Sequence, residues 1–216
     1  MNFFIIGDVH GCFYTLEEIL KQWNTENEHL IFVGDLIDRG NYSAKVVKKC
    51  MQLQQAYPNC SIIKGNHEYE FIEHYDNGPN LNWIQQGGDQ TLEDFNTNHL
   101  DHQEIQNWFV GLPLKFETEN IMITHAGITE TEAPYEEDSE DSVLWNRKGL
   151  KNIHKLQIHG HTPLKQEKPL FDPKSNSVNI DTGAVYGYGL TGLKISEEAV
   201  IIDIITAPTD ARDIRK

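Results

Sequence analysis

Three short apolar segments in the first third of the chain each lead into a glycine followed by a polar side chain. The segments span residues 2–7, 29–34 and 62–63, and the polar turns are Gly7-Asp8, Gly34-Asp35 and Gly65-Asn66. Apolar residues between the segments recur at helical spacing, and Thr15 with Glu18 is expected to form a capping box at the first helix. This β-α-β-α-β order predicts parallel strands joined by right-handed crossovers. Because α/β folds place their sites at the carboxyl ends of such strands, the three turns are expected to lie close together.

The rest of the chain predicts a helical stretch followed by further strands. Residues 66–111 carry a helical pattern with turn signals at Asn77-Gly78-Pro79 and at Gly87-Gly88. Strands are expected at residues 113–124, 155–159, 177–182, 190–195 and 199–205. No repeat or linker interrupts this pattern, so we interpret residues 1–216 as a single α/β domain.

The charge of the chain limits its expected partners. It carries 33 acidic and 18 basic side chains, a formal net charge of −15. Such a surface repels nucleic acids and anionic lipids, whereas it tolerates basic peptides, so neither nucleic acid nor membrane is an expected partner. No apolar run approaches the ~20 residues that span a bilayer, and the N-terminus lacks a signal-peptide pattern, so a cytoplasmic location is expected. Segment 130–141 holds seven acidic residues and is either a solvated loop or a docking surface for basic peptide.

The cysteines are predicted to be free thiols. Cys12, Cys50 and Cys60 form no C-x-x-C pair and are odd in number, which favours a reducing compartment. Cys12 adjoins the first polar turn. A small buried apolar side chain is the expected role there, and redox sensitivity is the alternative.

Five predicted strand ends carry Asp, Asn or His beside glycine. They read Gly7-Asp8-Val9-His10-Gly11, Gly34-Asp35-Leu36-Ile37-Asp38-Arg39-Gly40, Gly65-Asn66-His67-Glu68, His125-Ala126-Gly127 and His159-Gly160-His161-Thr162. Each motif alone is an ordinary turn or a structural histidine, but the five together indicate a pair of metal ions. Carboxylate, imidazole and amide-oxygen ligands select Mn, Fe or Zn over Ca or Mg, and the lack of thiolates argues against a structural zinc site.

These five motifs, in this order, resemble the phosphoprotein phosphatase family of calcineurin-like metallophosphoesterases, and most of all its small bacterial and lambda-phage type. The resemblance runs from about residue 3 to residue 195 and includes Leu144-Trp145-Asn146-Arg147 and residues 180–186, although residues 70–120 match only in length. It implies an α/β sandwich of two mixed β-sheets flanked by helices, with metals at one edge.

The resemblance also implies a role for each motif residue. Asp8 and His10 would hold the first metal, Asp35 would bridge both metals, and Asn66, His125 and His161 would complete the second. His159 and His161 share one strand end and spacing alone selects neither, but the family pattern favours His161. His67 would be the general acid and Asp38 its orienting partner, while the substrate would contact Arg39, Arg147, Asn66 and Tyr186.

The implied activity is metal-dependent hydrolysis of phosphomonoesters by in-line attack of a hydroxide shared by two divalent ions, with Mn²⁺ expected and Fe or Zn as alternatives. The expected substrate is a phosphorylated protein or peptide, and the enzyme would be a serine/threonine-directed or dual-specificity protein phosphatase. A monomer is compatible with the sequence, which leaves the oligomeric state open.

The nearest alternative is a dinucleoside tetraphosphate hydrolase, which shares the fold and the metals. Such enzymes tend to carry glutamine at the position of His10 and GNHD as the third motif, so His10 and Glu68 favour the phosphatase. A catalytically dead scaffold is disfavoured because every proposed ligand is present, and a metallo-nuclease is disfavoured by the net charge of −15.

Overall fold

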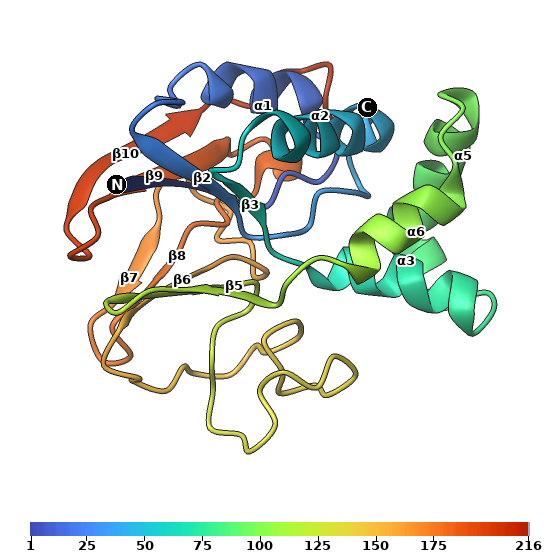
Figure 1. Cartoon of the computed structure of the whole chain (residues 1–216). Coiled ribbons are helices and arrows are strands. Elements are labelled where there is room, and N and C mark those ends of the chain that lie inside the picture. Colours follow the sequence, from blue (N-terminus) through green and yellow to red (C-terminus); the bar gives the residue numbers. More distant parts are fainter. Residues whose placement is uncertain (216) are drawn as a thin grey trace.

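The structure, a computed structural model that describes residues 1–215, contains two five-stranded mixed sheets that lie one above the other (Figure 1). The first sheet has the order β10-β9-β1-β2-β3 and the second has the order β4-β5-β6-β8-β7. The strands of the first sheet are β1 Asn2–Ile6, β2 Glu28–Phe32, β3 Cys60–Ile62, β9 Leu190–Ile195 and β10 Ile201–Ala207. Those of the second are β4 Lys115–Glu117, β5 Ile121–Thr124, β6 Leu156–His159, β7 Leu170–Asp172 and β8 Ser177–Asn179.

Each sheet contains three neighbouring parallel strands, and for β1, β2 and β3 the alternation of apolar segments and helices predicts this arrangement. β1 and β3 both run parallel to β2, and β5 and β8 both run parallel to β6. In the first sheet the antiparallel strands β9 and β10 both lie on the β1 side and β3 forms the other edge, whereas in the second sheet the antiparallel strands β4 and β7 form the two edges. The carboxyl ends of the parallel strands therefore meet at one edge of the sandwich.

The helices lie outside the sandwich. Helices α1 (Phe13–Leu20) and α2 (Ser43–Ala56) cover the outer face of the first sheet (Figure 1). A second group extends beyond β3 and follows the third motif along the chain. It contains α3 Asn66–Asp76, the short α4 Leu81–Trp83, a π-helical turn Ile84–Gly88, α5 Asp89–Thr97 and α6 His102–Val110. Among residues 1–215, no helix is long and apolar enough to cross a bilayer.

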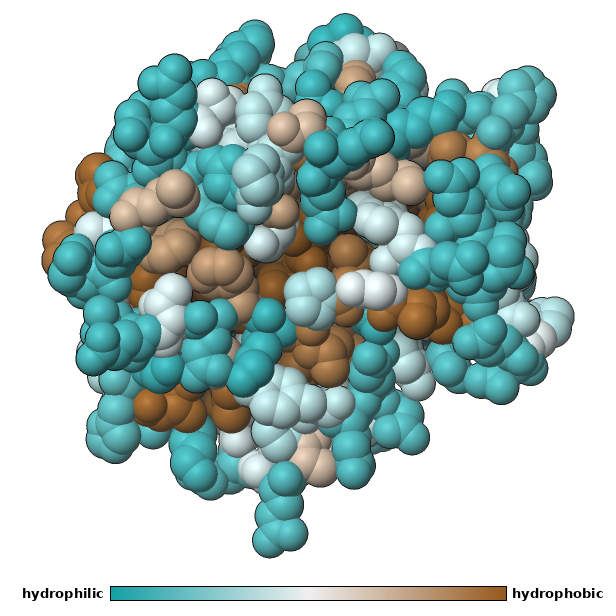
Figure 2. Space-filling model, in the orientation of Figure 1, coloured by the Kyte–Doolittle hydropathy of each residue, from teal (hydrophilic) through white to brown (hydrophobic). Residues whose placement is uncertain are grey.

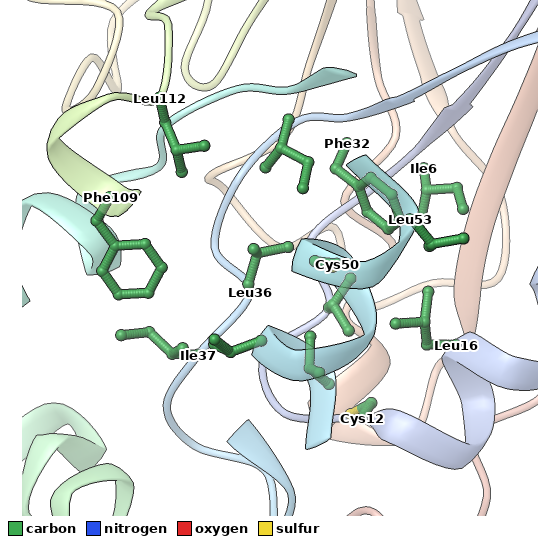
Figure 3. Close-up of a cluster of buried hydrophobic side chains, with 14 of the residues drawn as sticks. Ile6, Cys12, Leu16, Phe32, Leu36, Ile37, Cys50, Leu53, Phe109 and Leu112 are labelled. Carbon is green, nitrogen blue, oxygen red and sulfur yellow. The ribbon is translucent and has the colours of Figure 1, made fainter. Parts of the chain in front are cut away.

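The alternating side chains of the strands divide the core into two layers. On β1, Phe3 and Ile5 join the cluster between the sheets, whereas Phe4 and Ile6 join the cluster under the helices. Figure 3 shows the helix-side cluster, in which Leu16 of α1 and Cys50 of α2 approach Ile6. Each strand is thus fixed in register from both faces, which holds the loops at its end in place.

The surface reflects the composition of the chain. Hydrophilic residues dominate the face shown in Figure 2, and hydrophobic residues reach it near the centre and at the left edge, over β10. Ile201, Ile202 and Ile204 of β10 are exposed there. β10 is an edge strand, so its outer backbone groups have no neighbouring strand within the described sheet.

Two local predictions were wrong. Thr15 lies inside α1 rather than at its N-cap, which is Cys12, and the Thr15 hydroxyl donates to Asp213 instead of forming a capping box with Glu18. The predicted strand 113–124 is a hairpin, in which β4 and β5 pair antiparallel around a turn. The sequence analysis also missed β7, which is only three residues long and pairs with β8 at the edge of the second sheet.

Candidate metal centre

The loops that follow the parallel strands contain an unusual concentration of left-handed backbone. His10, Asp35, Asp38, Arg39 and His161 have φ values of 44°, 50°, 71°, 67° and 71°. Such conformations are uncommon for residues with a side chain, and each costs about 1–3 kcal/mol and persists only where the surrounding structure enforces it. Backbone strain of this kind clusters at sites whose geometry serves a function.

Glycines allow these loops to pack backbone against backbone. A Cβ at Gly34 would lie 2.5 Å from the nitrogen of Gly65, and a Cβ at Gly65 would lie 2.3 Å from the nitrogen of Asp35. A Cβ at Gly160 would lie 1.8 Å from Oδ1 of Asp8. The second and third motifs therefore touch directly, and so do the first and fifth.

Glu68 connects the second and third motifs. Its buried carboxylate accepts hydrogen bonds from the backbone N–H groups of Asp35 (2.9 Å), Leu36 (2.8 Å) and Gly65 (2.8 Å). The same residue lies in the first turn of α3, so the helix, the Asp35 loop and the Gly65 turn are held as one unit. Sequence reasoning treated Glu68 only as a marker of substrate class and missed this structural role.

Two groups of candidate metal ligands share Asp35. Ligand atoms of His10, Asp35 and His67 lie within 4.8 Å of one another, and so do those of Asp35, His125 and His161. The Asn66 amide oxygen belongs beside the second group, 3.0 Å from Nε2 of His125 and 2.9 Å from Nδ1 of His161. Asp8 lies at the same edge, where its Oδ2 accepts from the backbone N–H of His161 at 3.0 Å.

The structure thus brings together all six residues that the resemblance implies as ligands, and all six are buried. His67 also falls within reach of the first group, although the resemblance implies a proton-transfer role for it. His159 belongs to neither group, and its ring contacts the carbonyl oxygen of Gly160 at 3.2 Å. The geometry therefore favours His161 over His159.

Hydrogen bonds at Nδ1, the ring nitrogen that faces away from the ligand groups, orient two of the imidazoles. Nδ1 of His10 donates to the carbonyl oxygen of Ile37, and Nδ1 of His125 donates to that of Val33, each at 2.9 Å. Each ring then directs the lone pair of Nε2 into the site. Outer hydrogen bonds of this type are the usual support of metal-binding histidines.

Unpartnered polar atoms test whether metal ions fit this site. Four buried side-chain nitrogen or oxygen atoms lack a hydrogen-bond partner within residues 1–215, and three of them lie here: Asp8 Oδ1, His67 Nε2 and His161 Nε2. Buried polar atoms are normally paired, so three orphans at one place point to a ligand of the folded protein. Carboxylate, imidazole and amide oxygen are the donors that suit first-row transition metals.

The charges in the site also suit a cation. Burial and the carboxylates of Asp181 and Asp35 raise the pKa of Asp8 well above its usual value. Burial and the charge of Asp35 raise the pKa of Asp181 to about 7. Burial would raise the pKa of Asp35 as well, but the imidazoles of His125 and His67 lower it well below the usual value. Three carboxylates in one buried place repel each other, and divalent ions would relieve that repulsion. The residues present therefore fit two metal ions.

His67 and Asp38 form a second functional pair beside the ligands. Nδ1 of His67 lies 2.6 Å from Oδ2 of Asp38, and both side chains are fully buried. The Trp83 indole donates to Oδ2 of Asp38 and the Thr91 hydroxyl to Oδ1, each at 2.6 Å. Sequence reasoning missed Trp83 and Thr91, because they come from the helical stretch where the resemblance covers length alone.

The environment of His67 favours its protonated form. Burial by itself lowers the pKa of the ring, but the Asp35 carboxylate and the hydrogen bond to Asp38 outweigh burial and raise the pKa. Because Asp38 holds Nδ1, the proton on Nε2 is the one that can be transferred. Nε2 lies 3.9 Å from Oδ2 of Asp35, at the side where the ligand atoms gather.

The remaining predicted residues surround the centre at different depths. The Arg39 guanidinium is half-buried and contacts Nε2 of His10. Arg147 is exposed, and it contributes, after burial and His125, to lowering the pKa of His161 to about 2. Tyr186 lies in the 3₁₀ turn Ala184–Tyr186 and is 45% exposed, with the Lys165 ammonium 5.5 Å from its ring centre. A contact between Tyr186 and the substrate stays a prediction.

A site of this kind, built at the carboxyl ends of parallel strands in a two-sheet sandwich, defines a metal-dependent phosphoesterase. Residues 1–188 match the family model described as calcineurin-like phosphoesterase. The chain belongs to that family, and its α/β architecture of two mixed sheets flanked by helices confirms the predicted fold.

Curated relatives of similar length carry the name asymmetrical bis(5'-nucleosyl)-tetraphosphatase PrpE. The protein from Oceanobacillus iheyensis is 28% identical, over 93% of this chain and 91% of the relative. One from Bacillus cereus is 28% identical, over 97% of this chain and 95% of the relative. These relatives carry the name of the alternative activity rather than that of a protein phosphatase.

Solved structures of both activities share the fold. A candidate diadenosine tetraphosphatase aligns with a TM-score of 0.70 and 20% identity, covering 97% of this chain and 94% of its own. A serine/threonine phosphatase of Saccharomyces cerevisiae aligns with a TM-score of 0.66 and 16% identity, and the alignment covers 96% of this chain and 80% of the phosphatase. At these identities the likeness establishes the fold alone.

Proposed function

We propose that this phosphoesterase hydrolyses bis(5'-nucleosyl) tetraphosphates asymmetrically, releasing a nucleoside triphosphate and a nucleoside monophosphate. The observation that carries the proposal is the similarity to PrpE relatives over more than nine-tenths of both chains. The proposal replaces phosphorylated protein, the substrate first expected from the sequence, with the alternative.

The role of Glu68 removes one argument for the phosphatase. Its carboxylate is consumed by three backbone N–H groups that hold the Asp35 loop and the start of α3. Glutamate at this position therefore serves to fix the loops, and it does not distinguish a phosphoprotein from a nucleotide substrate.

The proposed centre uses the chain's own residues in three ways. His10, Asp35 and Asp8 would hold one divalent ion, and Asp35, Asn66, His125 and His161 would hold the other, with manganese expected first and iron or zinc as alternatives. Such a pair supplies a nucleophile from water at neutral pH and neutralises phosphate charge. Arg39 and Arg147 would bind phosphoryl oxygens with the planar fork of the guanidinium.

Proton transfer falls to His67. Its Nε2 is buried, has no hydrogen-bond partner among residues 1–215 and is held in place through Asp38, so it can donate a proton to the oxygen that leaves phosphorus. A nucleotide phosphate is a better leaving group than the alkoxide of serine, so it depends less on this proton.

A phosphoprotein substrate remains the second candidate, because one observation favours it. Asp138, Glu140 and Asp141 line the cavity beside Arg147, and such a rim attracts basic peptide and repels a nucleotide anion. Asp138 and Glu140 are, however, exposed and screened by salt, and Asp141 is paired with Lys148.

The test compares the two substrates on the manganese-loaded protein. We expect kcat/KM for diadenosine tetraphosphate to exceed that for a phosphoserine peptide at least 100-fold, with ATP and AMP as the products. ADP as the main product would contradict asymmetrical cleavage. A higher kcat/KM for the phosphopeptide would establish the second candidate instead.

A further inference from the structure

We infer that the cavity beside the metal centre binds one nucleoside of the substrate, with the Trp145 indole stacked on the base. The inference rests on the proposed function. The cavity measures about 440 Å³, within the range of about 300–1,000 Å³ that is usual for ligand sites. Its lining combines one aromatic ring, two cations and three carboxylates, namely Trp145, Arg147, Lys148, Asp138, Glu140 and Asp141.

One wall of the cavity is joined to the fourth motif. The backbone N–H of Ala126 donates to the carbonyl oxygen of Val143 at 2.6 Å, and the Asn146 amide lies 3.5 Å from the carbonyl oxygen of Ala126. Ala126 directly follows the candidate ligand His125. Trp145 and Arg147 flank Asn146 in the chain, so the same segment that borders the metal centre also lines the cavity.

The segment that lines the cavity is also joined to the third motif. The buried Lys64, two residues before Asn66, forms an ion pair with Glu137 at 3.0 Å. The Trp145 ring meets Tyr69 of α3 edge-on, with 5.9 Å between ring centres, and its Nε1 donates to the carbonyl oxygen of Glu137 at 2.7 Å. These contacts hold the indole in one orientation, and a preorganised aromatic ring binds a flat partner at low entropic cost.

The lining matches the three parts of a nucleotide. The indole offers a stacking face to the base, the carboxylates of Asp138 and Glu140 can accept from ribose hydroxyls or ring amines, and Arg147 can bind phosphate. Lys148 is paired with Asp141 at 2.6 Å, which offsets one of the negative charges. The cations and the indole would thus lead from the metal centre toward the base.

A single nucleoside site next to the centre also accounts for off-centre cleavage. If one base is fixed in the cavity, the number of phosphates between that base and the metal ions is fixed as well. Because the cavity adjoins the centre, the metal ions reach the phosphates nearest that base, and attack falls near one end of the tetraphosphate and not at its midpoint.

Fluorescence titration tests the inference with AMP and inorganic phosphate as probes. We expect AMP to quench tryptophan fluorescence in the wild type and in Trp108→Phe, but at least fivefold less in Trp145→Phe. Trp108 is a matched control, because its indole donates to Gln54 on the helical side of the molecule. Inorganic phosphate should give no comparable quench in any variant. Equal quenching by AMP in Trp145→Phe and in the wild type would overturn the inference.

The ratio of kcat/KM values for two substrates separates loss of base stacking from loss of structure, because partial unfolding lowers both values equally. Removing one stacking contact should lower the ratio of kcat/KM for diadenosine tetraphosphate to that for p-nitrophenyl phosphate by about 10-fold in Trp145→Ala. An equal fall for both substrates would assign Trp145 a structural role. A selective fall for a basic phosphopeptide would make the cavity a peptide site. If the wild type binds AMP through Trp145 but does not cleave the tetraphosphate, the proposed function fails while the nucleoside site stands.

Discussion

Asp35 is the residue on which the contacts of the candidate centre converge. Its carboxylate lies 3.4 Å from Nε2 of His10 and 3.3 Å from Nε2 of His125, and it accepts from the backbone N–H of His67 at 3.1 Å. Glu68 fixes its backbone, which adopts a left-handed φ of 50°. The side chain therefore lies within reach of both ligand groups.

We predict that Asp35→Asn reduces bound metal to less than one ion per chain, because it removes the negative charge that both groups share. Elemental analysis of the manganese-loaded protein measures this directly. His159→Gln is the matched control and should retain the wild-type content, since His159 lies outside both ligand groups. Wild-type metal content in Asp35→Asn would remove that residue from the bridging role.

His67→Asn should lower kcat with little change in metal content. Loss of a general acid costs about 10²–10⁴-fold in rate, and we expect the full loss for a phosphoserine peptide, whose alkoxide must be protonated. The loss for diadenosine tetraphosphate and for p-nitrophenyl phosphate should be at least 10-fold smaller. Steady-state kinetics on the three substrates measure these losses, and an equal fall in kcat for all three would exclude proton donation by His67.

Arg147 and Arg39 differ in burial, and their truncation separates two roles. Each change to alanine should lower kcat/KM by an amount equivalent to about 2–4 kcal/mol if the guanidinium binds the phosphoryl group in the transition state. Inhibition by inorganic phosphate should weaken in parallel. Unaltered kinetics in Arg147→Ala would leave that exposed residue as a surface side chain.

The cysteines should be unreactive in the folded protein. All three are free and buried, and burial raises the pKa of Cys60 to about 12 and that of Cys12 further still. A thiol reacts as thiolate, so these side chains stay protonated and inert at pH 8. We expect a thiol reagent such as DTNB to titrate no group in native protein and three in denaturant. One fast-reacting thiol would support the redox role considered for Cys12.

Most of the individual site residues could be predicted from the sequence, because each lies in a motif at a strand end. The residues that hold them in place could not. Trp83 and Thr91 hold Asp38 from the helical group, and Asp181 adds charge beside Asp8, yet none of the three stands at a spacing that indicates its partner. Such contacts depend on how distant segments meet in space.

At the scale of elements, the start of α1 depends on the C-terminal segment. The N-cap residue Cys12 makes no side-chain cap, and Asp213 takes that place by accepting from the backbone N–H groups of Tyr14 (3.0 Å) and Thr15 (2.7 Å). The Asp213 carbonyl oxygen also accepts from Asn41, just after the second motif. Residues 212–213 thus contact both the start of α1 and the loop after the second motif, and Figure 1 shows the C-terminal end of the described chain near α2.

Asp213→Ala should lower the free energy of unfolding by about 1–3 kcal/mol, because it leaves buried backbone donors of α1 without an acceptor. Urea denaturation measures the change. Asp210→Ala is the matched control: that carboxylate pairs with Arg212 at the surface, so its loss should leave the free energy of unfolding close to the wild-type value. Equal stability of the two variants would contradict the capping role.

Helices and strands could be predicted where apolar residues recur at a regular spacing in the sequence. The parallel strands and the first two helices follow from apolar spacing, since each buries one or both faces. The capping box failed because the true cap comes from residue 213, about 200 positions away in the chain. β7 has three residues, two of them exposed, so no alternation was available to reveal it.

At the scale of the whole molecule, a protein of net charge −15 gathers its site charges at one edge of the sandwich. The two sheets bring five motifs together there, and the ligand groups and His67 lie around Asp35. The central claim is that this edge is a two-metal centre for phosphate hydrolysis.

Titration of metal-depleted protein with Mn²⁺, following AMP release from diadenosine tetraphosphate, tests that claim most directly. The account predicts negligible activity without metal and a rise that saturates at two ions per chain. Full activity at one ion per chain, or activity that persists without metal, would contradict it.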